Sequence, residues 1–192
     1  MPTQVERRTA TRAALLAAGR EVFTEKGFAA TGREEIAERA GVTRGALYHH
    51  FDSKQAAFAA VASELDAELG AVVVRAARKG STPLEQLTLS CRAYLEACAE
   101  PAVARILLGE AAAVLGSDWV RRSNESACLV LLTPALQGMD VPGNTHIAAQ
   151  LILGMLNEAA AIVAASPRPK AEVRKVFPTV LAFLERLLSR GG

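Results

Sequence analysis

Apolar side chains recur along this chain at the spacing expected of amphipathic helices. The first such pattern runs from about Glu6 to Lys26, and its stripe consists of Leu15, Leu16, Gly19, Val22 and Phe23. Gly27 follows at once. It predicts a sharp helix stop with positive φ, which would bring Phe28 against Phe23.

Turn signals divide the rest of the chain and predict an all-α fold of about nine helices. We expect a three-helix N-terminal unit over residues 1–53 and a larger helical domain over residues 54–192. Beyond the N-terminal unit, the predicted helices are 54–78, 83–98, 102–114, 118–136, 145–165 and 170–189. Pro134 should end or kink the fourth of these.

The segment from Gly32 to Phe51 has the spacing of a helix-turn-helix. A small residue stands where two helices must cross, a glycine that tolerates positive φ ends the first helix, and Thr43 can cap the second. An isolated match of this kind also fits an ordinary helical hairpin, but here the spacing, the cap and a trailing basic residue agree. The predicted framework residues are Ile36, Ala37, Gly41, Val42, Leu47 and Phe51.

The opposite face of the second helix carries the side chains that a recognition helix needs. Arg44 can bond bidentately to guanine in the major groove, and Gly45 permits close approach to the duplex. Tyr48 and His49 offer donors to phosphates or base edges, and Lys54 can neutralise a phosphate. The predicted DNA-binding residues are Arg33, Thr43, Arg44, Gly45, Tyr48, His49 and Lys54.

Composition supports the helical prediction, whereas net charge adds little to the case for DNA. Hydrophobic residues make up 51% of the chain and aromatic residues 5%, and long runs of Val, Ile and Thr are absent. The net charge of +2 divides into eight Lys/Arg against seven Asp/Glu in residues 1–53, and fourteen against thirteen in residues 54–192. The argument for DNA therefore depends on where particular residues lie.

Cysteine usage and hydropathy predict a reduced, cytoplasmic protein without a membrane span. The chain has three cysteines, without CxxC spacing: Cys91, Cys98 and Cys128. The N-terminus lacks the apolar core of a signal peptide. The most apolar stretch, 147–165, contains Gln150, Asn157 and Glu158, which favours a buried helix. We expect no metal and no cofactor.

The N-terminal third, from about Thr11 to Leu69, resembles the DNA-binding domain of the TetR family of bacterial regulators. The resemblance is carried by Leu15-Leu16, Phe23, Gly27-Phe28, Thr31, Ile36-Ala37, Ala40-Gly41-Val42-Thr43, Gly45 to Phe51 and Ser53-Lys54. The family often has Ser or Thr where this chain has Gly32. We expect Thr31 to substitute as the helix cap, with Glu34 completing a capping box.

The resemblance implies a dimeric repressor that binds a palindromic operator and is released by a small molecule. Dimerisation would use the last two helices, about 145–165 and 170–189, which are rich in apolar residues. The effector would bind among the preceding helices, and few charges there favour an apolar or aromatic molecule. The candidate pocket residues are Cys91, Tyr94, Cys98, Leu107, Glu110, Trp119, Asn157 and Glu158.

Each of these pocket residues also fits a purely structural role in the core. Two other functions stay open. One is a DNA-binding protein with a filled core and no effector. The other is an enzyme that uses Cys91 as a nucleophile, although the chain has no GxSxG motif, phosphate-binding loop or metal-spaced cluster.

Overall fold

The computed structural model describes residues 3–127, 132–137, 139, 141 and 143–188. Within these residues the fold is all-α, as the sequence predicted, with ten α-helices and one π-helical segment. The helices are α1 (Gln4–Ala30), α2 (Arg33–Arg39), α3 (Arg44–His50), α4 (Lys54–Ala77), α5 (Pro83–Cys98), η1 (Val103–Glu110), α6 (Ala111–Leu115), α7 (Ser117–Ala127), α8 (Thr133–Gln137), α9 (Thr145–Ala165) and α10 (Pro169–Leu188).

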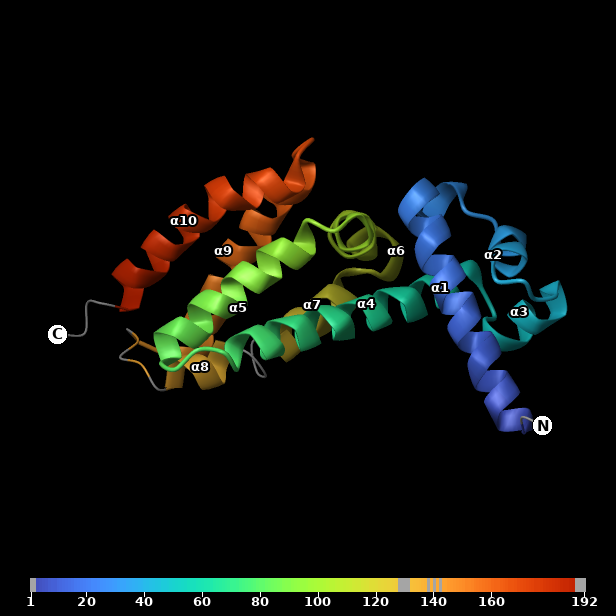
Figure 1. Ribbon diagram of the computed structural model, residues 1–192, viewed down its shortest axis with the longest axis horizontal. Coiled ribbons are helices and arrows are strands. Elements are labelled where there is room, and N and C mark those ends of the chain that lie inside the picture. Colours follow the sequence, from blue (N-terminus) through green and yellow to red (C-terminus); the bar gives the residue numbers. More distant parts are fainter. Residues whose placement is uncertain (1–2, 128–131, 138, 140, 142, 189–192) are drawn as a thin grey trace.

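The helices form an elongated molecule with a small helical unit at one end (Figure 1). α1, α2 and α3 make this unit, and α4 leaves it to run along the remaining helices. α5, α9 and α10 pack together at the other end, and η1 and α6 lie between the two ends. The long helix α4 therefore connects the predicted DNA-binding unit to the rest of the chain.

The predicted stripe of the first helix forms the core of the N-terminal unit. All of its residues are buried, and the ring of Phe23 packs edge-on against that of Phe58 with centroids 5.1 Å apart. Phe28 lies 6.2 Å from Phe23 and 5.3 Å from Phe58, which confirms the expected contact between Phe23 and Phe28. Gly27 has the predicted positive φ of 79°. With its ψ of 171° the regular helix is interrupted at Gly27, as predicted, and a short helical turn follows to Ala30.

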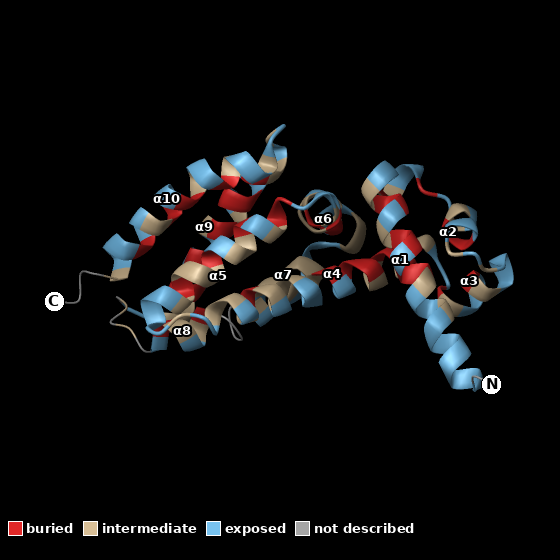
Figure 2. Cartoon of the chain, in the orientation of Figure 1, coloured by how far each residue is buried: buried red, intermediate tan, exposed pale blue. Residues whose placement is uncertain are grey.

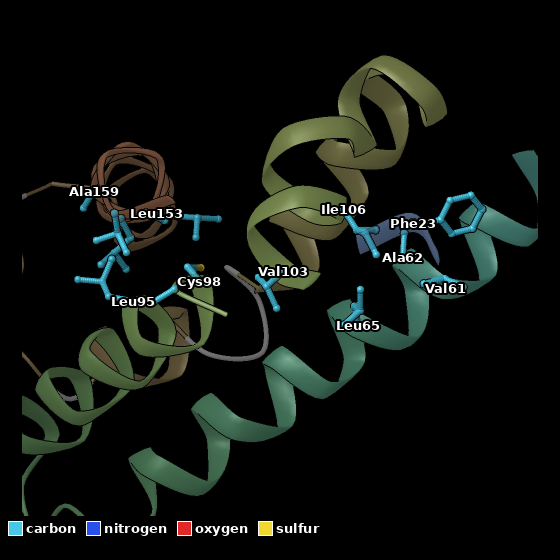
Figure 3. Close-up of a cluster of buried hydrophobic side chains, with 14 of the residues drawn as sticks. Phe23, Val61, Ala62, Leu65, Leu95, Cys98, Val103, Ile106, Leu153 and Ala159 are labelled. Carbon is cyan, nitrogen blue, oxygen red and sulfur yellow. The ribbon is translucent and has the colours of Figure 1, made fainter. Parts of the chain in front are cut away.

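One hydrophobic core runs through the whole described chain. Figure 3 shows Val103 and Ile106 of η1 pointing toward Leu65 on α4, close to Ala62 and Phe23. Leu65 and Ile106 are each at most 1% exposed. Figure 2 shows that the buried part of α4 is concentrated in its first half, next to α1. Because α1 and α4 share this close-packed core with η1, a displacement of η1 requires side chains of α1 and α4 to repack.

The middle of the chain differs from the sequence-based prediction. Residues 102–114 were expected to form one regular helix, but Val103 to Glu110 form a π-helix that is followed by the short α6. Long π-helical segments are rare and often occur at functional sites. Of the predicted helix 118–136, the described residues contain α7 and α8, and Pro134 lies in the first turn of α8. Cys128 is outside the described residues.

By length and composition alone, α9 could cross a membrane, but 44% of its most apolar 18-residue stretch is buried inside the molecule. A soluble core helix passes the same test. Eight of its residues are buried, among them Ala149, Leu156 and Val163. The sequence-based expectation of a core helix agrees with this packing.

Candidate nucleic-acid interface and interior cavity

The local structure of the helix-turn-helix agrees with the predicted framework. Ile36, Ala37, Leu47 and Phe51 are all at most 5% exposed, so they form the joint core of α2 and α3. Gly41 has a φ of 66°, which a residue with a side chain rarely adopts. The amide of the next residue, Val42, donates to the Ala37 carbonyl at 3.0 Å and closes the turn.

The N-terminus of α3 is capped as predicted and its outer face is open to solvent. The Thr43 hydroxyl accepts a hydrogen bond from the Ala46 amide at 3.2 Å. Arg44, Gly45 and His49 are exposed, and Tyr48 is 42% exposed. These side chains lie opposite buried Leu47, so the surface that was predicted to read DNA is available to a ligand.

Tyr48 and Arg33 hold each other in place beside this surface. The Arg33 guanidinium lies over the Tyr48 ring, 4.3 Å from its centroid, and donates to the Asp52 carbonyl at 3.2 Å. The Tyr48 hydroxyl donates to Glu34 Oε1 at 3.0 Å. A backbone hydrogen bond first, and this hydroxyl second, lower the pKa of Glu34. Two predicted DNA-binding side chains are thereby pre-oriented on the free protein.

Two sequence-based expectations about the edge of this site are changed by the structure. Gly32 itself is the N-cap of α2 and makes no side-chain cap. Thr31 is buried, and its hydroxyl donates to the Gly27 carbonyl at 2.6 Å, so its predicted capping box with Glu34 is wrong. The Lys54 ammonium donates to three carbonyl oxygens at the end of α1, from Phe28, Ala29 and Thr31. In the free chain Lys54 therefore caps α1, and a phosphate contact would have to replace one of these bonds.

A group of basic residues that sequence reasoning missed lies next to α3. Arg7, Arg8 and Arg12 are exposed on the N-terminal half of α1, and the Arg12 guanidinium lies 5.5 Å from the centre of the Phe51 ring. Burial first, and then the charges of His49, Arg8 and Arg12, lower the pKa of His50. The i, i+4 spacing of Arg8 and Arg12 was the available signal.

The larger domain contains a cavity of about 530 Å³ between α4, α5, α7 and α9. Five of the eight predicted pocket residues line it: Cys91, Tyr94, Leu107, Trp119 and Asn157. The Tyr94 hydroxyl donates to Asn157 Oδ1 at 2.6 Å, and burial raises the pKa of Tyr94. Burial also raises the pKa of the Cys91 thiol to about 12, which keeps it protonated and disfavours it as a nucleophile.

The other three predicted pocket residues lie elsewhere, each for a local reason. Cys98 is fully buried where the end of α5 meets η1, one helical turn beyond the lining of the cavity (Figure 3). Glu158 is exposed on α9. Glu110 points away from the cavity toward α1, and its Oε2 accepts a hydrogen bond from the Phe28 amide at 2.8 Å. Their assignment to the pocket is wrong.

Comparison with known proteins agrees with this arrangement over both parts of the chain. Residues 15–61 match the family described as "Bacterial regulatory proteins, tetR family", and residues 84–187 match "Tetracyclin repressor-like, C-terminal domain". A crystal structure of a TetR-family transcriptional regulator from Pectobacterium atrosepticum is 33% identical, covers 98% of this chain and 99% of that one, and superposes with a TM-score of 0.81. The chain belongs to the TetR family.

Curated relatives of this TetR-family chain include both activators and repressors. The transcriptional activator FasR of Mycolicibacterium smegmatis is 36% identical over 44% of this chain and 39% of its own length. The transcriptional repressor BepR of Brucella suis is 39% identical over 45% of this chain and 42% of its own length. The chain thus spans about two fifths of each of these relatives. It is a DNA-binding transcriptional regulator with a helix-turn-helix domain.

In this TetR-family chain the two parts are joined by polar contacts as well as by the shared core. Besides the bond from Phe28 to Glu110, the Arg105 guanidinium lies 3.4 Å from the Thr24 and Glu25 carbonyl oxygens and 4.0 Å from Glu110. A Cβ on Gly27 would collide with the Glu110 carboxylate. The π-helical segment η1 therefore contacts α1 through Arg105 and Glu110, while its Leu107 lines the cavity.

The outer faces of α9 and α10 carry large apolar side chains in contact with solvent. Leu151 is 71% exposed, Ile147 55%, Ile162 50% and Phe183 63%. Gly154 is exposed on the same face of α9, and no atom lies within 4 Å of the position of a Cβ there. A partner helix could approach α9 closely at this point.

Proposed function

We propose that this chain is a dimeric, ligand-responsive repressor in the cytoplasm that binds a palindromic DNA operator. The observation that carries the DNA-binding part is the exposed face of α3. Thr43 caps the helix, Arg44 and Gly45 are open to solvent, and Arg33 and Glu34 hold Tyr48 in place. A rigid, solvent-exposed helix N-terminus of this chemistry suits base recognition in the major groove.

Base contacts in this proposal come from Arg44, Tyr48 and His49, with Gly45 allowing close approach. Phosphate contacts come from Arg33, from Thr43 and from the arginines at the start of α1. Half or more of the hydrogen bonds in protein–DNA complexes go to phosphates and sugars, which fix the position of the protein. Lys54 joins this set only if DNA displaces one of its three carbonyl partners.

Dimerisation through α9 and α10 would cover the exposed apolar side chains and place two copies of α3 on one face of DNA. Ile147, Leu151 and Ile162 lie at i, i+4 and i+15 on α9 and so share one side of that helix. Exposed apolar patches of this kind mark sites of protein association. A two-fold dimer matches a palindromic site whose half-sites are about one helical turn apart.

Ligand response in this proposal begins at the cavity and reaches α3 by two routes. α4 lines the cavity with Leu69 and Val73 and begins directly after α3. η1 lines it with Leu107 and contacts the end of α1 through Glu110. A small molecule that binds one arrangement of these helices better than the other shifts the dimer toward the state that does not fit the operator.

A DNA-binding protein without an effector is the second candidate, and the unfilled cavity disfavours it. A filled core would leave no space among the middle helices, whereas about 530 Å³ is present. Enzymatic use of Cys91 is disfavoured by its protonated, buried thiol. Repression, rather than activation, is proposed because release by a small molecule is the common mode in the family.

Selection from a random duplex library tests the proposal without knowledge of the genome. The full-length protein should enrich a palindrome, and the complex should contain two protein chains by sedimentation or mass measurement. Binding to that palindrome should weaken steeply as the salt concentration rises, because arginines that contact phosphates displace counterions from the DNA. Enrichment of no common sequence, or of an asymmetric site bound by a single chain, would contradict the proposal.

A further inference from the structure

The cavity contains one formally charged lining residue within the described chain, Asp66 of α4. The other lining side chains are apolar, aromatic, hydroxyl or amide groups. Lining residues come from α4, α5, η1, α6, α7, α8 and α9 or their ends, and neither Lys, Arg nor His occurs among those described. The interior of the cavity therefore carries a net negative charge.

The carboxylate of Asp66 is only partly satisfied by the protein. Its Oδ1 accepts a hydrogen bond from the Ser123 hydroxyl at 2.8 Å, and the described residues provide neither a second hydrogen bond nor an ion pair. On α7, the Arg121 guanidinium is already paired with Asp118 at 3.7 Å and Glu125 at 3.4 Å. A half-buried carboxylate in this situation gains free energy when a cation binds beside it.

Aromatic side chains complete a site for a cationic molecule. Trp119 and Tyr94 line the same cavity as Asp66, and indole and phenol ring faces attract ammonium groups. Asn157 and Asn124 add neutral amide groups, and Asn157 is already bonded to Tyr94. The rest of the lining is aliphatic, including Val73, Leu107 and Leu156, which suits an apolar body.

We infer that the effector is an organic cation: an amine or quaternary ammonium group that pairs with Asp66, attached to an apolar or aromatic body that packs against Trp119. The inferred effector is thus more specific than the apolar or aromatic molecule expected from the sequence, because it also carries a positive charge. The inference rests on the proposed function, in which the cavity binds a small molecule. An anionic ligand such as a fatty acid or acyl phosphate would place like charge beside Asp66 and is disfavoured.

A matched set of probes tests the charge preference directly. Phenylbutylammonium, phenylbutanol and phenylbutyrate share one apolar body and differ in the charge of the head group. Trp119 is the single tryptophan of the chain and lies in the cavity, so its fluorescence reports binding there, with calorimetry as an independent readout. The full-length protein should bind the ammonium probe most tightly and phenylbutyrate least.

Asp66→Asn keeps the shape of the side chain and removes its charge. It should weaken the ammonium probe by about 10- to 100-fold, the range for a hydrogen bond to a charged group, and leave phenylbutanol within about twofold. Glu64→Gln removes one charge from the exposed side of α4 and should change neither affinity. Asp66→Glu retains the charge, so it should keep the preference even if Asp66→Asn lowers the melting temperature.

Equal affinity for all three probes, no detectable binding of any, or an unchanged affinity of Asp66→Asn for the ammonium probe would overturn the inference. The proposed function fails separately. If the cation binds and the affinity for the selected palindrome does not change, the release mechanism is wrong while the charge assignment stands. If the palindrome is bound and the charge preference is absent, only the present inference is wrong.

Discussion

Removing the Glu110 carboxylate should loosen the junction between the cavity domain and the DNA-binding unit. Its Oε2 accepts the Phe28 amide at 2.8 Å, and the side chain is 26% exposed. A hydrogen bond to a charged acceptor contributes about 1.5–3 kcal/mol, and partial exposure places this one at the lower end. Glu110→Ala should therefore cost about 1.5 kcal/mol locally, because the half-buried amide at the break in α1 loses its partner.

The rate of amide hydrogen exchange at Phe28 reports directly on its hydrogen bond to Glu110. A loss of about 1.5 kcal/mol corresponds to exchange that is roughly tenfold faster. Glu100→Ala is a suitable control, since it removes a carboxylate that forms only an exposed surface pair with Lys170. Unchanged exchange at Phe28 in Glu110→Ala would refute the idea that η1 holds α1 through this side chain.

Three further substitutions test other parts of the structure. Leu151→Glu should give monomers by analytical ultracentrifugation, since it places a charge at the most exposed apolar position on α9. Val5→Glu changes a similarly exposed apolar side chain on α1 and should leave the dimer intact. A dimer in both variants would exclude the outer face of α9 as the dimer interface. Lys54→Met should lower the free energy of unfolding in urea by about 1–2 kcal/mol, because three carbonyl oxygens at the end of α1 lose a charged donor; an unchanged midpoint would mean that water replaces it. His50, whose pKa lies below its ordinary value of 6.5, is more readily protonated in the unfolded chain, so stability should fall as the pH drops below about 6.5. His50→Asn should make that dependence shallower, and an equally steep dependence would assign it to other groups.

The helix-turn-helix was predictable because its determinants are local. Gly41 must adopt positive φ, Thr43 must cap α3, and Leu47 with Phe51 must share a face, and each of these follows from a few adjacent residues. The burial of the first-helix stripe was predictable in the same way, from its 3.6-residue period.

Features that depend on distant partners were not predictable. Glu110 was listed among the pocket candidates of the middle helices, but its partner, the Phe28 amide, lies 82 positions earlier in the chain. The π-helical winding of η1 also changes which side of the helix each residue occupies. Asp66 was not among the pocket candidates, because only the tertiary structure places it opposite Ser123, 57 positions later in the chain.

The central claim is that the outer face of α3 reads base sequence, and the most direct test compares affinities for the selected palindrome and a shuffled duplex. Arg44→Ala should lose about 1–3 kcal/mol on the palindrome and much less on the shuffled duplex. Arg75→Ala is the matched control, because it removes the same charge roughly 30 Å farther along the molecule, near the end of α4. The claim would be contradicted if Arg44→Ala still preferred the palindrome over the shuffled duplex as strongly as the wild type does. It would also be contradicted if Arg75→Ala lost that preference to the same extent.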